Sequence, residues 1–477
     1  MIFSADNLPT GLTLDPQTGQ ITGTAPRAGE YTVTLRAKNA GGDTRRNLLI
    51  KSGNTLALTP PMGWVSWNCF GASVSDAKIR AAADAMVKSG LINHGWTYIN
   101  IDDFWQKSPT FRQRTPQGMV EDPTLTGPER SPDGTILPNL RFPDMKGLAD
   151  YIHAKGLKVG LYSSPGAYTC GGCTGSYQHE DQDARQYAAW GFDSLKYDWC
   201  GYRKIYQESE GVAGMKKPYE VMAASLAKVN RDIIYSLSPG LRTYAWINGH
   251  KNIIGYIWQW APGAGANLWR TGDDIHDSWK SVIANGEQLK DIGSFASPGH
   301  WNDPDMLVVG HISWGGKPST LTPDEQYTEI SLWSLGATPL LLSCDLSRFD
   351  PFTLGLLTND EVIAVDQDPL GKAAHVIPSI TPQTLSTPSA NAGIPSVQTW
   401  VRPLHDGSLA VGLVNLGDSA ATASVNWSDL QLNGSWAVRD LWRQKDLGTF
   451  TQKFEASVPA HGVVLVRIAS PGALPLD

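Results

Sequence analysis

One pattern dominates the chain from about residue 56 to residue 370: short apolar segments that end in polar residues alternate with helical patterns. Each apolar segment has about the length of a buried strand. Parallel strands need long crossover connections, which helices usually supply, so this repetition predicts a parallel sheet covered by helices. The best-defined apolar segments are Tyr98–Asp103, Lys158–Ser163, Asp193–Asp198, Ile233–Leu237, Ala266–Arg270 and Pro339–Ser343.

Two helical patterns are clearest between these segments. Residues 75–87 open with Ser75 as an N-cap and close near Gly90, and residues 142–153 end before Gly156. A closed (β/α)8 TIM barrel fits a repeat region of roughly 300 residues best. A doubly wound open sheet is the alternative, but no GxGxxG motif follows the first strand. We therefore expect an α/β barrel as the main domain.

Two β-rich segments flank the predicted barrel. Residues 1–52 are rich in Gly, Thr and Pro, and residues 31–38 alternate apolar and polar side chains as a half-buried strand does. This segment resembles the immunoglobulin-like modules of secreted bacterial proteins, and we expect it to be truncated at its start. Residues 371–477 predict a C-terminal antiparallel β-sandwich that follows a loop over residues 378–388. The barrel is assigned to residues 56–370.

Composition excludes several classes of protein. The 477 residues are 41% hydrophobic and 18% charged, which is typical of a globular chain with a large core. The formal net charge of −7 and the lack of a long basic patch argue against nucleic acid as a partner. No apolar run is long enough for a membrane span, and the oligomeric state stays open. No signal peptide is visible at the start. Because the start looks cut into a β module already under way, we expect a secreted or periplasmic protein whose signal has been removed.

Acidic residues recur where the predicted strands end. Taken singly, each acid would serve to cap the following helix. However, the carboxyl ends of all barrel strands surround one mouth of the barrel, so we expect these acids to gather there. Such a cluster is costly unless a cation or a hydroxyl-rich ligand shares it, and Lys196 and Arg270 supply positive charge. Lys196 lies two residues before Asp198, so both point to one side of a strand. The acids are Asp102, Asp103, Asp198, Asp273, Asp274, Asp303, Asp305 and Asp345.

These residue types suit a neutral, polyhydroxylated ligand. Carboxylates accept hydrogen bonds from sugar hydroxyls, Lys and Arg donate to them, and some of the 18 Trp residues can cover the apolar face of a ring. A metal site is the competing hypothesis, but His179–Glu180 is not part of an HExxH motif and Cys170–Cys173 has no second CxxC. We therefore expect no metal and no other cofactor. Two carboxylates are enough to hydrolyse a glycoside.

Five motifs, in order along the chain, carry a resemblance to a known family. Over roughly residues 58–370 the chain resembles the retaining α-galactosidases of glycoside hydrolase family 27. The resemblance implies a (β/α)8 barrel and an exo-acting enzyme that releases terminal α-D-galactose from a galactoside by double displacement. The motifs are Pro60–Trp64, Ile99–Asp103, Leu195–Cys200, Leu268–Ile275 and Trp301–Leu307.

The resemblance also implies roles for individual residues. Asp198 resembles the nucleophile and Asp274 the acid/base. Cys170 and Cys200 match the family's disulfide beside the site, and Cys173 is an additional thiol. The substrate-binding residues that the resemblance implies are Trp64, Asp102, Asp103, Tyr162, Lys196, Cys200, Ser238, Arg270 and Asp305.

The two catalytic carboxylates need opposite protonation states. Lys196 is expected to favour the ionised form of Asp198. The charges of Asp198 and Asp273 are expected to raise the pKa of Asp274, so that it starts the reaction as an acid. Asp273 is the weaker candidate for the acid/base itself, because alternation along a strand would turn only one of the two toward the sugar.

Other functions stay open at this stage. Ser238 takes the place of a larger residue that contacts the sugar 2-position in many members, and relatives that accept N-acetylgalactosamine also have a small residue there. Phe104–Trp105, in place of a commoner Gly-Trp, would narrow the pocket for the 6-hydroxymethyl group, as in β-L-arabinopyranosidases. Outside the enzymes, a non-catalytic carbohydrate-binding barrel and a structural surface module are the alternatives. The presence of both Asp198 and Asp274 disfavours the pure binder.

Overall fold

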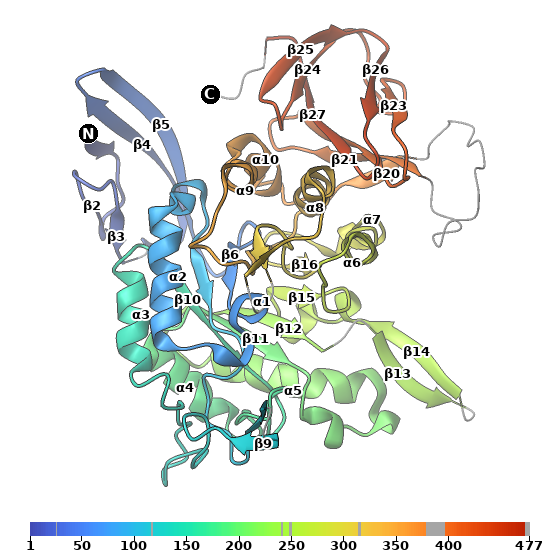
Figure 1. Cartoon of the computed structure of the whole chain (residues 1–477). Coiled ribbons are helices and arrows are strands. Elements are labelled where there is room, and N and C mark those ends of the chain that lie inside the picture. Colours follow the sequence, from blue (N-terminus) through green and yellow to red (C-terminus); the bar gives the residue numbers. More distant parts are fainter. Residues whose placement is uncertain are drawn as a thin grey trace. The chain divides into compact units, whose positions relative to one another are not determined.

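The computed structural model of the chain forms two compact units, Met1–Leu56 and Ala57–Asp477 (Figure 1). The expected loop over residues 378–388 lies outside the residues that the structure describes, and the bounds of the three predicted domains stay predictions. The described residues are 1–24, 26–115, 118–239, 242–247, 250–312, 316–377 and 396–472.

The larger unit is built on an eight-stranded parallel sheet that curls into the predicted barrel. Its strands pair in the order β16-β15-β12-β11-β10-β7-β6-β19, so each barrel strand lies beside the next one along the chain. Among the described residues no ladder pairs the two end strands; instead Leu307, four residues after the first of them, forms a bridge with Leu342 of the other, and its N–H donates to the Leu341 carbonyl at 2.8 Å. The barrel strands are β6 (Met62–Val65), β7 (Tyr98–Asn100), β10 (Lys158–Ser163), β11 (Ser194–Asp198), β12 (Ile234–Ser238), β15 (Leu268–Arg270), β16 (Trp301–Asp303) and β19 (Leu340–Leu342).

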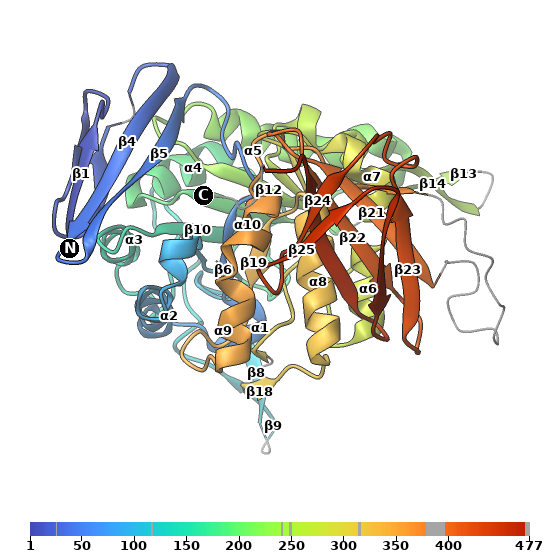
Figure 2. The same cartoon turned by 90° about the horizontal axis from the view of Figure 1, so that it is seen from above.

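Helices connect these strands and cover the sheet, as Figures 1 and 2 show. Local sequence explains where they begin: the Ser75 hydroxyl accepts from the Lys78 N–H at the start of α2, and Thr322 and Glu325 form a capping box at the start of α8. The helices are α1 (Trp67–Phe70), α2 (Asp76–Lys88), α3 (Met145–His153), α4 (Glu180–Trp190), α5 (Gly211–Leu226), α6 (Trp279–Gly286), α7 (Leu289–Ile292), α8 (Pro323–Gly336), α9 (Pro351–Leu357) and α10 (Asp360–Asp366).

Strand alternation separates the core from the site. In β11, Leu195 and Tyr197 are buried in the main hydrophobic core, whereas Lys196 and Asp198 belong to the opposite side of the strand. The register of the sheet sets Asp198 level with Ser238 of β12 and Lys196 level with Tyr162 of β10. Parallel pairing therefore delivers side chains from different segments to one end of the barrel.

A hairpin follows β12 that the sequence did not reveal. Strands β13 (Arg242–Ile247) and β14 (His250–Tyr256) pair antiparallel, and Figure 1 shows them extending from the barrel. Short 3-10 turns with Trp258 and Trp260 lead back to β15. Smaller pairs also occur in barrel loops: β8 (Arg112–Thr115) with β9 (Gly118–Glu121), and β17 (His311–Ile312) with β18 (Lys317–Pro318).

The predicted C-terminal β-sandwich is confirmed. A six-stranded antiparallel sheet, in the order β20-β21-β22-β27-β24-β25, accompanies the pair β23-β26. Alternating residues such as Val411, Leu413, Val425 and Phe454 form a second hydrophobic cluster between them. The strands are β20 (His375–Ile377), β21 (Val397–Pro403), β22 (Leu409–Asn415), β23 (Ala421–Asn426), β24 (Trp436–Asp440), β25 (Lys445–Phe450), β26 (Lys453–Val458) and β27 (Val463–Ala469).

The smaller unit is the predicted N-terminal β module. A three-stranded antiparallel sheet in the order β1-β4-β5 is accompanied by the pair β2-β3. Throughout the part of the chain that is described, no helix is both long and apolar enough to span a membrane. The strands of this unit are β1 (Ile2–Asp6), β2 (Leu12–Leu14), β3 (Ile21–Gly23), β4 (Gly29–Asn39) and β5 (Gly42–Ser52).

Candidate active site

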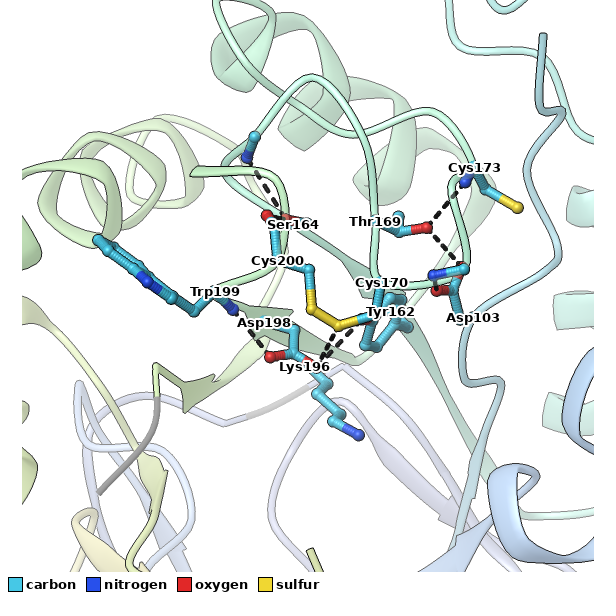
Figure 3. The surroundings of a disulfide bond; sticks show 12 residues. Asp103, Tyr162, Ser164, Thr169, Cys170, Cys173, Lys196, Asp198, Trp199 and Cys200 are labelled. Atoms are coloured by element: carbon cyan, nitrogen blue, oxygen red, sulfur yellow. Dashed lines mark hydrogen bonds between the residues drawn. A yellow bond between two sulfur atoms is a disulfide. The ribbon is translucent and has the colours of Figure 1, made fainter. Parts of the chain in front are cut away.

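Asp198 is the last residue of β11, and two donors hold its carboxylate (Figure 3). The Trp199 N–H donates to Oδ1 at 2.8 Å, and the Tyr162 hydroxyl donates to Oδ2 at 3.1 Å. Burial raises the pKa of Asp198 above its usual value. Lys196 acts in the expected, opposite direction, but its charge does not outweigh burial.

Lys196 connects Asp198 to the acids after β7. Its Nζ donates to Asp102 Oδ2 at 2.8 Å and lies 5.3 Å from the centre of the Tyr162 ring. Burial disfavours the ammonium, but Asp102, Asp198 and Asp305 outweigh it and raise the pKa of Lys196. Lys196 is therefore a permanent cation in the site.

Asp103 is held by the loop between β10 and α4. Its Oδ1 accepts from the Thr169 hydroxyl at 2.8 Å and from the Phe104 N–H at 2.8 Å, and its Oδ2 accepts from the Gly171 N–H at 2.7 Å. Burial raises the pKa of Asp103 to about 6 despite these donors. A Cβ at Gly171 would lie 2.5 Å from the Phe104 ring, so only glycine fits there. Sequence reasoning missed this role of Thr169 and Gly171, although two glycines inside the CxxC segment were a visible sign of a tight turn.

Cys170 and Cys200 form the disulfide that the resemblance implied (Figure 3). Their Cα atoms are 4.9 Å apart, and the Cys170 sulfur lies 3.6 Å from Asp198 Oδ2. Cys173 is a buried free thiol whose backbone N–H donates to the Thr169 hydroxyl at 3.0 Å. The disulfide thus lies directly beside the carboxylate of Asp198.

The other half of the site lies on the turns after β15 and β16. Buried Arg270 directs Nη2 to Asp305 at 3.0 Å and to Asp274 at 3.2 Å. Asp305 Oδ2 also accepts from the Ile275 N–H at 2.9 Å. Asp305 has a φ of +86°, and its own N–H donates to Asp303 Oδ1 at 2.9 Å. Asp305 therefore ties its own turn to the turn that carries Asp274, an arrangement that the sequence did not predict.

The electrostatics of Asp274 differ from the expectation. Its side chain is 88% exposed and accessible to solvent. Partial loss of water around the carboxylate acts to raise its pKa, but Arg270 and then Lys196 outweigh this, so that the pKa of Asp274 is lowered. The predicted upward shift from Asp198 and Asp273 is therefore wrong for the free enzyme, because the cations lie closer to the carboxylate than sequence spacing suggested. Asp273 is its exposed neighbour in the same turn.

The remaining residues that were predicted to line the pocket lie either at the rim of the barrel or inside it. Ser238 ends β12 in register with Asp198, at the rim. Trp64 is fully buried, and its indole N–H donates to the Cys344 carbonyl at 2.7 Å. Trp105 is also fully buried, whereas Phe104 has a φ of +77° and stacks on Trp67 with ring centres 6.2 Å apart. The binding roles of Trp64, Tyr162, Cys200 and Ser238 stay predictions.

A cavity of about 60 Å³ lies inside the barrel next to these groups. Its charged lining consists of Asp102, Lys196, Arg270, Asp303 and Asp305, and uncharged polar and apolar residues form the rest. Burial raises the pKa of Asp303 to about 6. The Arg270 Nε is buried without a hydrogen-bond partner among the described residues, so the guanidinium keeps a free donor. The arrangement concentrates acids and two cations around one small space that is large enough for more than one water molecule.

Comparison with known proteins separates the functional classes. The family profile described as "Alpha galactosidase A" matches residues 59–368. The chain belongs to the α-galactosidase family, glycoside hydrolase family 27. Two more profiles match the segments on either side of the barrel. The profile "Alpha galactosidase C-terminal beta sandwich domain" matches residues 395–468, and an Ig domain profile matches residues 2–52.

Relatives match this α-galactosidase family member along most of its length. The alpha-galactosidase of Cyamopsis tetragonoloba is 36% identical over 413 residues, which cover 86% of this chain and 85% of that protein. The alpha-N-acetylgalactosaminidase of Gallus gallus is 36% identical over 337 residues, covering 67% and 72%. The crystal structure of alpha-galactosidase I from Mortierella vinacea has a TM-score of 0.72 at 31% identity and covers 88% of this chain and 99% of its own. The chain is therefore a glycoside hydrolase, and the non-catalytic alternatives are set aside.

Proposed function

We propose that this enzyme is an exo-acting, retaining α-galactosidase that releases terminal α-D-galactose through a covalent intermediate. One observation carries the proposal: Asp198 ends a barrel strand, is held by two donors, and shares Arg270 and Lys196 as cationic neighbours with Asp274. Retaining glycosidases need one carboxylate as nucleophile and a second as acid and base. Asp198 is half-buried and held by two donors, whereas the side chain of Asp274 is exposed to solvent.

In the first step, an oxygen of Asp198 forms a bond to C1 of the galactose. The bond between C1 and the glycosidic oxygen breaks, and the Asp274 carboxyl gives its proton to the departing oxygen. The Trp199 N–H and the Tyr162 hydroxyl orient Asp198 for this attack. Fixing the carboxylate in advance removes part of the entropy cost of reaching the reactive geometry.

In the second step, Asp274 takes a proton from water as the water attacks C1, and the Asp198 ester is released. Esterification removes the charge of Asp198, which lowers the proton affinity of Asp274 further and suits its role as a base. The first step needs the opposite state. We propose that a sugar 2-hydroxyl engages Arg270 and weakens its pull on Asp274, so that substrate binding itself restores the proton.

The acids after β7 are proposed to hold the sugar. Asp102 and Lys196 form an ion pair at 2.8 Å whose spare lone pairs and protons can meet the 3-, 4- and 6-hydroxyls. Asp103 accepts three protein hydrogen bonds, so it has less remaining capacity than Asp102. We therefore assign Asp102 and Lys196 as the main galactose contacts, with Asp103 fixing the loop beside them.

The test is turnover of an aryl α-galactoside followed by proton NMR. The first product to appear is expected to be α-galactose, and Asp198→Asn is expected to lose on the order of 10⁴-fold in kcat. Asp273→Asn is the matched control for Asp274→Asn, since the two acids are adjacent but, among the described residues, Asp274 is the one that forms an ion pair with Arg270. Early β-galactose, or an Asp198→Asn variant with near-normal turnover, would overturn the proposal.

Substrate range is the second question for the same site. The small Ser238 at the end of β12 favours tolerance of a 2-acetamido group, and one relative carries the name alpha-N-acetylgalactosaminidase. Phe104, held against Trp67, favours a narrowed pocket and hence β-L-arabinopyranoside. The measurement is kcat/KM for three aryl glycosides: the α-galactoside, the α-N-acetylgalactosaminide and the β-L-arabinopyranoside. We expect the α-galactoside to have the highest kcat/KM.

We also propose that the enzyme works outside the cytoplasm. A disulfide at the active site persists only where the surroundings are oxidising. Recovery of activity from the medium or periplasm of the source cells, with little in the cytoplasmic fraction, is the expected result.

A further inference from the structure

Two sulfur atoms and a carboxylate oxygen meet beside the proposed nucleophile. The Sγ atoms of Cys170 and Cys200 and an oxygen of Asp198 all lie within 4.8 Å of one another (Figure 3). No other trio of Cys, His or acidic side chains has this spacing in the described part of the chain. A group of two sulfurs and one carboxylate is the donor set that Zn²⁺ and related cations bind.

The disulfide keeps this donor set inactive. A sulfur in a disulfide has no thiolate charge to give to a cation, and thiolates are the species that bind metals. A dithiol reductant can reach the bond because Cys170 is exposed. In the exchange the S–S bond of the protein breaks and the dithiol is oxidised to a disulfide. Its two electrons and two protons pass to Cys170 and Cys200, which become thiols.

Reduction does not release the loop that carries Cys170. Its two chain neighbours both donate to the carboxylate of Asp103, the Thr169 hydroxyl at 2.8 Å and the Gly171 N–H at 2.7 Å. On the other side, the Ser164 hydroxyl donates to the Cys200 carbonyl. These hydrogen bonds do not depend on the S–S bond, so the two thiols stay next to Asp198.

We propose that reduction of Cys170–Cys200 by a dithiol, outside the oxidising surroundings in which the enzyme works, creates a binding site for a thiophilic divalent cation, which switches the enzyme off. The cation displaces the two thiol protons to solvent and takes both sulfurs and Asp198 as ligands, and water completes a tetrahedral shell. The loss of activity rests on the proposed function, in which Asp198 is the nucleophile. Once the cation binds the Asp198 carboxylate, its oxygen has no free lone pair with which to attack the sugar.

Charge balance favours this site once it is reduced. The Lys196 ammonium would repel a cation, but it is already paired with Asp102 at 2.8 Å. Two thiolates and one carboxylate bring three negative charges to a divalent ion. The same position is unfavourable for the cation in the oxidised enzyme, where Asp198 alone supplies a charge.

Cadmium is the probe, because its thiolate complexes absorb in the ultraviolet. The full-length enzyme is reduced with dithiothreitol, desalted without oxygen and titrated with Cd²⁺ while activity on an aryl α-galactoside is followed. We expect one Cd²⁺ per reduced chain, no thiolate absorption in the oxidised enzyme, and a loss of activity of at least about tenfold that tracks binding and reverses with a chelator.

Variants assign the ligands. Asp198→Asn is expected to weaken Cd²⁺ binding by at least the roughly 10- to 100-fold that loss of a supporting partner costs a metal site. Cys200→Ser is expected to abolish the one-to-one binding, whereas the matched control Cys173→Ser keeps it, since Cys173 lies outside the trio. Equal binding by reduced and oxidised enzyme, loss of binding in Cys173→Ser, or unchanged binding in Asp198→Asn would overturn the proposal. Normal Cd²⁺ binding by a chain with no galactosidase activity in either state would support the metal site and refute the proposed function.

Discussion

The Asp305→Asn substitution tests whether Asp305 positions the acid/base. Asp305 Oδ2 accepts from both Arg270 at 3.0 Å and the Ile275 N–H at 2.9 Å. Asn keeps the shape, still accepts from Ile275 and tolerates the φ of +86° better than most residues, so the turn should persist. What disappears is the negative charge opposite Arg270.

The size of the effect follows from that contact. A hydrogen bond between charged groups contributes about 1.5–3 kcal/mol, and a neutral one about half as much. The difference of about 0.75–1.5 kcal/mol corresponds to a fall in kcat/KM of about 4- to 13-fold. Arg270 would also act more strongly on Asp274, whose pKa it already lowers, so the protonated acid would be lost at lower pH. The basic limb of the pH profile is therefore expected to move down.

The assay is kcat/KM for an aryl α-galactoside across the pH range, with the thermal midpoint recorded for each variant. Asp277→Asn is the matched control, because its carboxylate lies in the loop that carries Asp274 but accepts from the Ser319 hydroxyl and the Thr320 N–H, each at 2.9 Å. Its basic limb should coincide with that of the wild type. A limb that stays in place or moves to higher pH in Asp305→Asn, with the fold intact, would refute the reasoning.

Three further predictions concern catalysis and stability. Tyr162→Phe removes a 3.1 Å hydrogen bond to Asp198, so kcat/KM should fall about 10- to 150-fold and the acid limb should move up, as measured by steady-state kinetics. Gly63→Ala places a Cβ 2.4 Å from a carbonyl of β7 and should cost about 1–3 kcal/mol in urea unfolding, whereas Gly263→Ala meets open space and should cost little. Burial raises the pKa of Asp193, but the hydrogen bonds of its carboxylate outweigh burial and lower the pKa below 3.8. The carboxylate therefore stabilises the fold fully above pH 3.8, and this stabilisation is lost as the pH falls through the lower pKa of the folded state. Asp193→Asn should lose about 3 kcal/mol near pH 6 and less near pH 2, and an equal loss at both would contradict this.

Strand periodicity predicted the barrel because strands and helices leave different patterns in the sequence. The expected segment 158–163 coincides with β10, and segment 193–198 differs from β11 by one residue. The acids after these strands were predicted to gather because topology alone carries parallel strand ends to one rim. Hairpin β13-β14 was missed, because the strand-helix repeat of a barrel contains no antiparallel strand pair between two barrel strands.

The balance of charge in the site was beyond the sequence. The lowered pKa of Asp274 depends on a 3.2 Å approach of Arg270, four residues earlier in a chain that is not helical there. The positive φ of Asp305 was equally hidden, because an Asp in the left-handed region leaves no sign in composition. Spacing along a strand gives the face of a side chain, but not which of several opposite charges comes nearest to it.

The bridge between Leu307, just after β16, and Leu342 of β19 gives the barrel a seam. Elsewhere neighbouring strands share a ladder, for example five registered pairs between β11 and β12, but here the described residues form no ladder, and the Leu307 N–H joins the two edges through the Leu341 carbonyl at 2.8 Å. The turn with Asp305 leaves β16 at this seam. A small displacement of that turn as a sugar enters or departs would disturb one bond instead of a ladder, so the wall that orients Asp274 can adapt while the strand that carries Asp198 stays fixed.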